Sequence, residues 1–449
     1  MRNMKRWSFR YEVLKFIASI VHRAAHKYFT VNGLENVPRN EPVILAPNHQ
    51  NALLDPLAII FSGDLQPAFL ARADIFRNKV VAGILNKMKI APVYRIRDGK
   101  DSLEKNKEVF ENSINILKTN RFLCLFPEAA HIGMKSMIPH KKAIPRIVFI
   151  AAEMTNFEMD IKIVPVGINY THYYQFRRSL TINYGKPISS KDYYEIYKNE
   201  GELKASIALR DAIFEAMKEL VVHVPDKPGY DLYDQAFAMM RPEAYEKAGV
   251  RKSLKNFVKA EQLLTEKIYF RLENNAEDKE ALIAKAKLYK KLKEKLGFSE
   301  DELEKGSINS GELLLNALLI TLLTPLGIYG AIANGWLFYL TRYPYRSRIK
   351  DPQFWSTFSF VFSLVFYPLW LIVQFFILQA FIPGWGLALG ITLFSIPSGI
   401  IGWETGQMIK RNFRRIKYKR LLKSKNKHFR EMLSLRKELK TYYQKTIEE

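Results

Sequence analysis

The sequence contains two short polar segments, NHQNALLD at residues 48–55 and FPEAAH at residues 126–131, each directly after an apolar run. Apolar runs of this length predict buried strands. In α/β proteins, the loops that follow strands carry many of the binding and catalytic side chains. The two segments place a histidine, an aspartate and a glutamate on such loops, so they indicate both the fold and the candidate site.

Around these segments, residues 41–188 alternate short apolar runs with stretches of helical length. Strands separated by helices favour substantial parallel pairing. A further amphipathic helix at 202–222 closes the unit, so we expect an α/β domain at 31–224 with a mixed, partly parallel sheet. The predicted strands are 43–46, 69–71, 122–126, 161–166 and 180–184, and the predicted helices are 79–88, 102–118 and 144–154.

The charge balance of the 449-residue chain points to an anionic partner. The formal net charge is +24 and the pI is near 9.7, which suits either nucleic acid or an anionic membrane surface. Much of the charge lies in residues 1–27 and 410–437, and the second stretch directly follows long apolar segments. Basic segments beside membrane spans bind anionic lipid. We therefore expect membrane lipids as a partner and no nucleic acid.

Residues 1–30 combine basic side chains with apolar residues at helical spacing, among them Val13, Phe16, Ile17 and Ile20. Charges interrupt the apolar run, which is unlike the hydrophobic region of a signal peptide. We expect an uncleaved amphipathic helix on or near the membrane interface. A helix that packs on the α/β domain is the alternative.

The second half of the chain predicts helices only. Residues 225–310 are rich in Glu, Lys, Ala and Leu, which indicates a charged helical connector. Apolar segments long enough to cross a hydrocarbon core of about 30 Å follow it. We expect an all-α membrane module at 311–404, with apolar segments at 313–340, 354–381 and 385–403, and a basic cytoplasmic tail at 405–449.

The topology of the membrane module follows from charge. The basic loop at 341–351 and the basic tail should both be cytoplasmic. An α/β domain on the same side requires an even number of crossings. Pro325 and Gly327 near the middle of the first apolar segment permit a kink or a hairpin. We therefore expect a re-entrant hairpin at 313–340 followed by two true spans, with three full crossings as the alternative.

His49 and Asp55 are the candidate catalytic pair. A carboxylate that holds a histidine in one tautomer lets it take a proton from a hydroxyl that attacks an ester-like carbonyl. The competing interpretation is a helix start, with Asp55 as N-cap and Pro56 at the first helical position. On a regular helix the two side chains would lie about 120° apart, so they can meet only across a turn.

Four ordered blocks resemble the phospholipid and glycerol acyltransferase family, the PlsC-type glycerolipid acyltransferases. The resemblance covers about the first half of the chain. It implies a membrane-bound O-acyltransferase of phospholipid biosynthesis that moves a fatty acyl chain from acyl-CoA or acyl-carrier protein to a glycerol hydroxyl, with no metal or other cofactor. The blocks are NH at 48–49 with Asp55, APVYRIR at 91–97, FPE at 126–128 and VPVG at 164–167.

The resemblance also implies roles for the block residues. His49 would be the general base, Asp55 would orient it, and Arg97 and Glu128 would help to bind a phosphate-bearing acceptor. An arginine fork suits phosphate, and Arg95 competes with Arg97 for this role. A glutamate suits phosphate poorly, so we expect Glu128 to accept a hydrogen bond from a glycerol hydroxyl or to position cations.

A basic run follows the third block. Its segment PHKKA at 139–143 resembles the Pro-x-Lys-Lys-Gly of many relatives, which favours Lys141 or Lys142 as a phosphate contact. The cationic candidates of the run are Lys135, His140, Lys141, Lys142 and Arg146.

Two positions depart from the family pattern. Five residues separate His49 from Asp55 where the family usually has four, and Ala129 replaces the usual glycine after Glu128. Alanine fits such a site only where the backbone has a negative φ. We therefore expect the third-block loop to turn differently from that of the family.

The acceptor and the carrier remain alternatives at this point. A large membrane module favours a lipid-soluble acceptor, 1-acylglycerol-3-phosphate (lysophosphatidate), whose acylation gives phosphatidate. Glycerol-3-phosphate is the alternative acceptor, and a non-catalytic scaffold that binds anionic lipid is the alternative outside the enzymes. The single cysteine, Cys124, lies in an apolar strand and is expected to be an inert core thiol.

Overall fold

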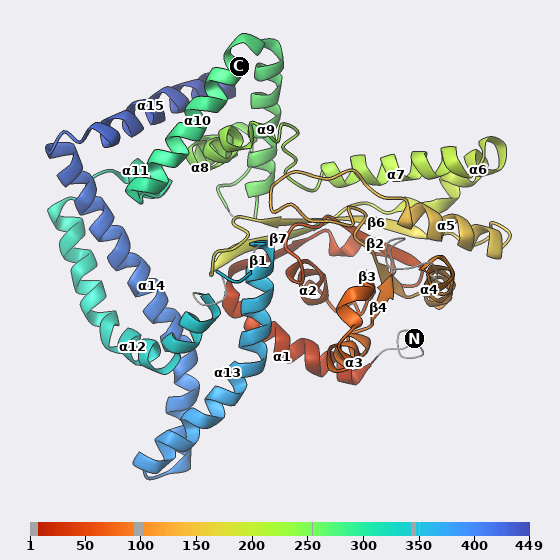
Figure 1. Ribbon diagram of the computed structural model, residues 1–449, viewed down its shortest axis with the longest axis horizontal. Helices are drawn as coiled ribbons and strands as arrows, with labels where there is room; N and C mark the ends of the chain where they lie inside the picture. The colour runs from red at the N-terminus through yellow and green to blue at the C-terminus, as the bar shows by residue number, and fades with distance from the viewer. Residues whose placement is uncertain (1–7, 94–101, 254, 343–346, 350) are drawn as a thin grey trace. The chain divides into compact units, whose positions relative to one another are not determined.

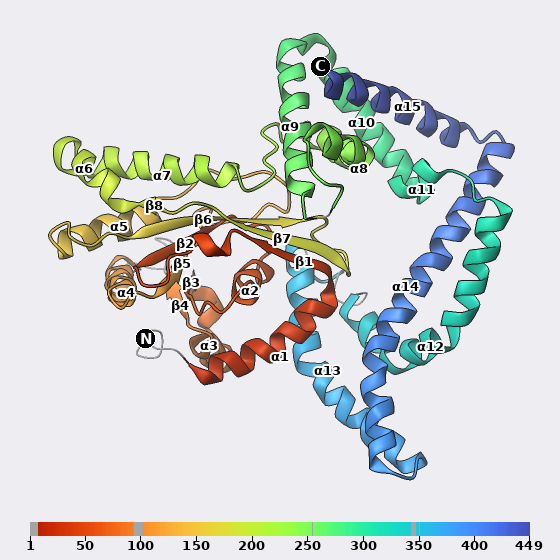
Figure 2. The same cartoon turned by 180° about the vertical axis from the view of Figure 1, so that it is seen from behind.

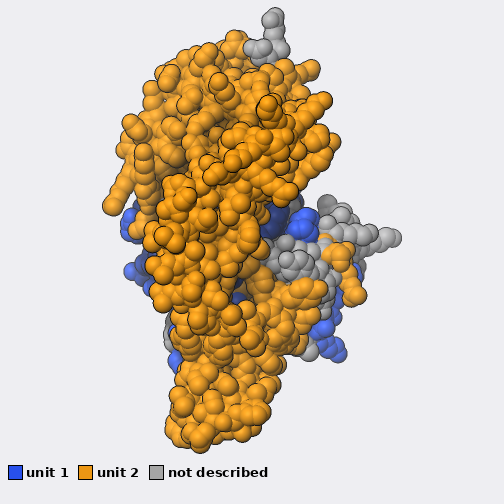
Figure 3. Space-filling view, turned by 90° about the vertical axis from the view of Figure 1, so that its left-hand side faces the viewer, with its two compact units in different colours: residues 1–223, 351–357 blue, residues 224–350, 358–449 orange. Residues whose placement is uncertain are grey.

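The structure, a computed structural model, describes residues 8–93, 102–253, 255–342, 347–349 and 351–449 (Figure 1). It forms two compact units, which Figure 3 distinguishes by colour. Unit 1 comprises residues 1–223 and 351–357, and unit 2 comprises residues 224–350 and 358–449. The first unit therefore includes a short stretch from the second half of the chain, residues 351–357.

Unit 1 is built on a mixed sheet, as the sequence predicted. Its described strands follow the order β1-β7-β6-β2-β5-β3-β4, and β8 pairs with β6. Strand β2 is parallel to β5 and β6, whereas β6 is antiparallel to β7. The strands are β1 His26–Asn32, β2 Val43–Pro47, β3 Ala68–Arg72, β4 Ile90–Val93, β5 Phe122–Cys124, β6 Lys162–Tyr170, β7 Arg178–Tyr184 and β8 Ile188–Ser189.

Helices cover both faces of this sheet. Figures 1 and 2 show α7 on one face and α2 and α3 on the other. The core under α5 and α7 contains Ile44, Leu123 and Leu209, each at most 1% exposed. The helices of unit 1 are α1 Phe9–Ala25, α2 Leu54–Phe61, α3 Lys79–Lys87, α4 Ser102–Leu117, α5 Ala143–Met154, α6 Tyr194–Glu200 and α7 Glu202–Lys218.

All five predicted strands overlap observed ones, and three further strands were not predicted. Strand β1 lies at an edge of the sheet, and most of its side chains are exposed or half-buried. It therefore lacks the continuous apolar run that marked the central strands. Strand β4 has only four residues and β8 only two, which is too short for a periodicity to show.

The first 30 residues do not form one helix. Helix α1 ends at Ala25, and the chain continues as β1, which pairs in parallel with β7. Tyr11 and His22 on α1 are buried, so this helix packs on the α/β unit. Phe9 and Phe16 on another face are 69% and 67% exposed, and the location of that face at a membrane interface stays a prediction.

Unit 2 consists of helices among its described residues. Three of them, α12, α13 and α14, are long and apolar enough to cross a membrane. The helices of unit 2 are α8 Tyr230–Lys247, α9 Phe257–Asn274, α10 Ala276–Leu296, α11 Glu300–Lys305, α12 Ser310–Arg342, α13 Gln353–Phe381, α14 Trp385–Lys423 and α15 Lys427–Glu448; the first turn of α13 belongs to unit 1.

Helix α12 runs without a non-helical break although Pro325 lies inside it. Its path bends, as proline inside a helix allows (Figure 1). Gly330 lies against the backbone of Ser398, and Gly327 lies against Gly402, so α12 and α14 approach to backbone contact. Small residues permit this packing between membrane helices. The re-entrant path of segment 313–340 and the number of crossings stay predictions.

The basic C-terminal stretch is not a separate tail. Helix α14 extends to Lys423, and α15 packs against the connector helices α8, α9 and α10. Phe429 and Leu439 of α15 are fully buried, and the hydroxyl of Tyr443 donates to the carbonyl of Leu232 at 2.7 Å. The apolar stripe of α15 was hidden among its many charges. Connector and tail together form one helical bundle.

The third-block loop contradicts the expectation for Ala129. This alanine has φ +54°, in the left-handed region that glycine adopts without strain. Ala52 in the first-block loop has φ +42°. The loop after Glu128 therefore keeps the backbone conformation that a glycine would favour, and the expected negative φ is wrong. Both candidate loops carry an alanine under backbone strain.

Gly167 of the fourth block should be sensitive to substitution. A Cβ atom there would overlap the backbone carbonyl of Leu220, which the side-chain amides of Asn169 and Asn183 fix at 2.9 and 3.0 Å. We expect Gly167→Ala to lower the free energy of unfolding by about 1–3 kcal/mol. Thermal unfolding of the purified protein in detergent would measure it. Gly83→Ala is the control, because no heavy atom of the described residues lies within 4 Å of a Cβ added at that helical position, and it should not destabilise.

Ala129→Gly should stabilise the protein. Glycine removes the left-handed strain at φ +54° at some cost in the entropy of the unfolded chain, for a net gain of about 0.5–1 kcal/mol. Ala130→Gly next to it is the control. Ala130 has no positive φ, so glycine there should destabilise by about 0.4–1 kcal/mol. Equal shifts of the melting temperature in both variants would contradict the assignment of strain to Ala129.

Candidate active site

The candidate site lies where neighbouring parallel strands end. His49 follows β2, Glu128 follows β5, and Tyr170 is the last residue of β6. Because β5 and β6 flank β2 and run parallel to it, their carboxyl ends meet at one edge of the sheet. This is the edge at which α/β folds bind their ligands.

Asn48 fixes the start of the first loop. Its backbone N–H donates to the carbonyl of Val166 at 3.2 Å. Its side chain then replaces the next strand residue, because Oδ1 accepts from the N–H of Ile168 at 2.6 Å and Nδ2 donates to the carbonyl of Ile168 at 3.1 Å. The asparagine amide thus prolongs the β2–β6 ladder by one step and orients the residue after it.

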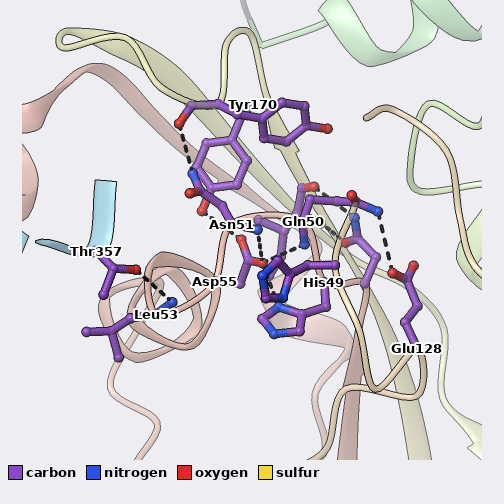
Figure 4. A network of polar contacts seen from close by, with 12 residues as sticks. His49, Gln50, Asn51, Leu53, Asp55, Glu128, Tyr170 and Thr357 are labelled. Atoms are coloured by element: carbon purple, nitrogen blue, oxygen red, sulfur yellow. Dashed lines mark hydrogen bonds and ion pairs between the residues drawn. The ribbon is translucent and has the colours of Figure 1, made fainter. Parts of the chain in front are cut away.

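Asp55 is the centre of the hydrogen bonds in Figure 4. Its Oδ2 lies 2.8 Å from Nδ1 of His49 and accepts the backbone N–H groups of Gln50 and Asn51, both at 2.7 Å. Its Oδ1 accepts the hydroxyl of Tyr170 at 2.9 Å. The Asp55 side chain is 0% exposed. Since a carboxylate only accepts, Nδ1 of His49 carries the proton and Nε2 is the basic nitrogen.

The helix-cap interpretation of Asp55 is wrong. Helix α2 begins at Leu54, with Leu53 as its N-cap, so Asp55 lies within the first turn. Its carboxylate accepts from Gln50 and Asn51, which precede the helix, whereas an N-cap accepts from residues that follow it. The required turn between His49 and Asp55 exists, and it lets the two side chains face each other across five intervening residues.

Glu128 connects the third block to the first. Its side chain is 0% exposed, and its Oε2 accepts the side-chain amide of Gln50 at 3.4 Å. The same amide donates to the carbonyl of Ser136 at 3.0 Å. The ring of Phe126 lies 4.4 Å from the ring of His49. The structure therefore brings Glu128 and His49 into one site.

The residues of the basic run at 135–146 differ in charge and in exposure to solvent. The backbone N–H of Lys141 donates to the carbonyl of Pro127 at 2.7 Å, which attaches this segment to the third-block loop. The side chains of Lys141 and Lys142 are exposed at the start of α5. His140 is buried against Phe214, and burial lowers its pKa to about 4, so its inclusion among the cations is wrong.

The second block reaches the site edge through β4, which ends at Val93. Arg95 and Arg97, the two candidates for an acceptor contact, lie outside the described residues. Their assignment stays a prediction.

The sequence did not identify Tyr170 and Arg178 as site residues. The guanidinium of Arg178 is buried and lies 5.1 Å from the centre of the Tyr170 ring, whose hydroxyl donates to Asp55. Its Nε donates to Nε2 of His26 at 3.3 Å, and Nδ1 of His26 donates to the carbonyl of His22 at 2.8 Å. No spacing in the sequence links these residues to the candidate pair, because the sheet alone brings them together.

Burial determines the protonation states of Tyr170 and His26. It raises the pKa of Tyr170 well above its ordinary value, with the charge of Asp55 acting in the same direction, so the hydroxyl stays a donor. Burial, with the positive charge of Arg178, lowers the pKa of His26 to about 3. Neutral His26 then has a free lone pair on Nε2 to accept from Arg178. The contacts are therefore consistent with a single protonation state at neutral pH.

Comparisons with known proteins agree with the four blocks. Residues 28–169 match the family model described as Acyltransferase. An uncharacterized acyltransferase of Schizosaccharomyces pombe is 28% identical over 105 residues, 23% of this chain and 15% of that protein. Glycerol-3-phosphate O-acyltransferase 2 of Saccharomyces cerevisiae is 28% identical over 122 residues, 27% of this chain and 16% of that protein.

A solved structure was also found, the 1-acyl-sn-glycerophosphate (LPA) acyltransferase PlsC from Thermotoga maritima. It is 19% identical, with a TM-score of 0.32, and the match covers 46% of this chain and 80% of that chain. The matched stretches span about a sixth of the length of the two curated yeast relatives. Residues 28–169 form a domain of the acyltransferase family that the four sequence blocks predicted.

Proposed function

We propose that this chain is a membrane-bound O-acyltransferase that moves a fatty acyl chain from an acyl thioester to a glycerol hydroxyl. The observation that carries the proposal is the hydrogen bond of 2.8 Å between His49 and Asp55 inside an acyltransferase-family domain. Three helices with the length and composition of membrane spans support a lipid product. A cytoplasmic location of the domain and of the basic helix α15 is part of the proposal.

His49 acts as the general base in this proposal. Asp55 holds its Nδ1 proton, so Nε2 takes the proton of the acceptor hydroxyl as the oxygen attacks the thioester carbonyl. The carbon–sulfur bond breaks, the new ester forms, and the thiolate leaves with a proton returned to it. The positive charge that develops on His49 is stabilised by the buried carboxylate 2.8 Å away.

Glu128 has a positioning role in this proposal. The side chain is fully buried and bonded to Gln50, so it fixes the two loops relative to each other. The exposed Lys141 and Lys142 remain the candidates for the phosphate of the acceptor, together with Arg97 or Arg95. Acyl-CoA and acyl-carrier protein both supply the thioester chemistry, so both belong in the assay.

Two acceptors have separate support. The apolar helices favour lysophosphatidate, which resides in the membrane and would become phosphatidate. The yeast relative named glycerol-3-phosphate O-acyltransferase 2 favours glycerol-3-phosphate. Incubation of the purified chain with labelled acyl-CoA or acyl-carrier protein and each acceptor, followed by lipid extraction, separates them. Absence of transfer to either would support a lipid-binding scaffold instead.

His49→Ala should abolish transfer in this assay. Loss of a general base lowers kcat by about 10²–10⁴-fold. Asp55 keeps three of its four donors without the imidazole, so the variant should stay folded and in the membrane fraction. Turnover near that of the unmodified chain in a purified preparation would contradict the assignment of the base.

Asp55→Asn should be nearly as damaging although it preserves the shape of the side chain. Both Asp55 oxygens accept hydrogen bonds, so either orientation of an amide puts an NH₂ group against a donor. The loss of the tautomer and of the charge should lower kcat about 10³-fold or more. Asp64→Asn is the matched control, because Asp64 is exposed and its ion pair, at 2.7 Å, is with the surface residue Arg39. It should retain full activity.

A further inference from the structure

The first turn of α13 belongs to unit 1, whereas the rest of the helix belongs to unit 2. Residues 351–357 carry this turn, and α13 continues to Phe381 as an apolar helix long enough to cross a membrane. A contact made by this turn is thus a contact of the first residues of a membrane segment. Two neighbouring side chains in it, Ser356 and Thr357, lead to the candidate site.

Thr357 binds the loop that carries the candidate pair. Its Oγ1 accepts the backbone N–H of Leu53 at 3.2 Å (Figure 4). Leu53 is the N-cap of α2 and lies two residues before Asp55. An N–H group at a helix start has no partner within the helix. The threonine hydroxyl supplies that partner at the point where the loop becomes a helix.

Ser356 reaches Asp55 by a second route. Its hydroxyl accepts from Nη1 of Arg178 at 3.0 Å and donates to the carbonyl of Tyr173 at 3.0 Å. Arg178 lies over the ring of Tyr170, and the hydroxyl of Tyr170 donates to Oδ1 of Asp55. The hydroxyl of Ser356 therefore fixes the buried guanidinium of Arg178. This guanidinium in turn orients Tyr170, the hydroxyl donor to Asp55.

Aromatic contacts place the same turn beside the base. The ring of Phe354 lies 5.5 Å from the ring of His131, which lies 5.2 Å from the ring of His49. Oδ2 of Asp351 lies 3.9 Å from Nε2 of His131. The turn thus borders both the loop and the histidine, and these contacts are independent of the two hydroxyl groups.

We propose that Ser356 and Thr357 are positioning residues of the acyl-transfer site. The loop at 48–55 holds its active geometry only while the first turn of α13 is docked, so the seating of this membrane helix controls turnover. A helix rises about 1.5 Å per residue, and a misplacement of about 1 Å costs up to about 10²-fold in rate. A small displacement of α13 along its axis would therefore break both contacts. This inference rests on the proposed function.

Thr357→Val tests the first contact. Valine keeps the branched shape and removes the acceptor, whereas Thr357→Ser keeps the hydroxyl. We expect Thr357→Val to lower kcat about tenfold with the acceptor KM within about twofold, and Thr357→Ser to keep at least half of kcat. The matched control is Thr321→Val on α12, whose hydroxyl bonds the carbonyl of Ala317 in its own helix at 2.9 Å. It should leave kcat unchanged.

Ser356→Ala tests the second contact in the same assay. It removes one of the hydrogen-bond acceptors of Arg178 and should lower kcat to a similar extent, and kcat of the double variant with Thr357→Val should fall about 10²-fold. Melting temperature and membrane fraction are measured for every variant. A role in positioning changes kcat alone, whereas a role in folding alone would lower the melting temperature and leave kcat per folded molecule unchanged.

The outcomes separate this inference from the proposed function. Transfer by the unmodified chain with wild-type kcat in both Thr357→Val and Ser356→Ala overturns the inference alone. An equal decrease of kcat in Thr357→Val and Thr357→Ser also overturns the inference, because the hydroxyl would then not be the relevant group. Absence of transfer by the unmodified chain to either acceptor overturns the proposed function and this inference with it.

Discussion

The carboxylate of Asp55 is buried, and a buried carboxylate costs free energy unless donors surround it. The local fold supplies four donors, of which two are successive backbone N–H groups, those of Gln50 and Asn51. Successive amides reach one oxygen only when the chain curls around it. The conformation of the loop between β2 and α2 therefore follows from the need to satisfy this one group, and the orientation of His49 follows from the loop.

Both loops of the candidate site contain a residue with a strained backbone conformation. Ala52 and Ala129 have positive φ angles on the two loops that meet at His49. Such a conformation costs a residue with a side chain about 1–2 kcal/mol, and it persists only when neighbouring contacts fix it. The bonds to Asp55 fix the first loop, and the bond from the backbone N–H of Lys141 to Pro127 fixes the third. Hydrogen bonds therefore fix the backbone of both loops, a property suited to a preorganised site.

The sequence predicted the parts of the molecule that rest on local pattern. Central strands were found because they are continuous apolar runs, and His49 and Asp55 were selected because they belong to the first of four ordered blocks that resemble a known family. Tyr170 and Thr357 were missed because their partners are 115 and 304 positions away in the chain. Helix α15 was missed as a packing element because its apolar stripe is diluted by charge. Long-range pairing leaves no periodic trace in a single sequence.

Arg178 connects the start of α13 to Asp55 through Tyr170. A buried guanidinium needs acceptors for its N–H groups, and its opposite charge, Asp55, lies beyond the ring of Tyr170. Neutral His26 takes one N–H group, and the carbonyl of Tyr173 and the hydroxyl of Ser356 take Nη1. Ser356 thus supplies one of the acceptors of a buried cation that lies over the ring of Tyr170, the hydroxyl donor to Asp55. The first turn of α13 is therefore part of the polar surroundings of Asp55 within unit 1.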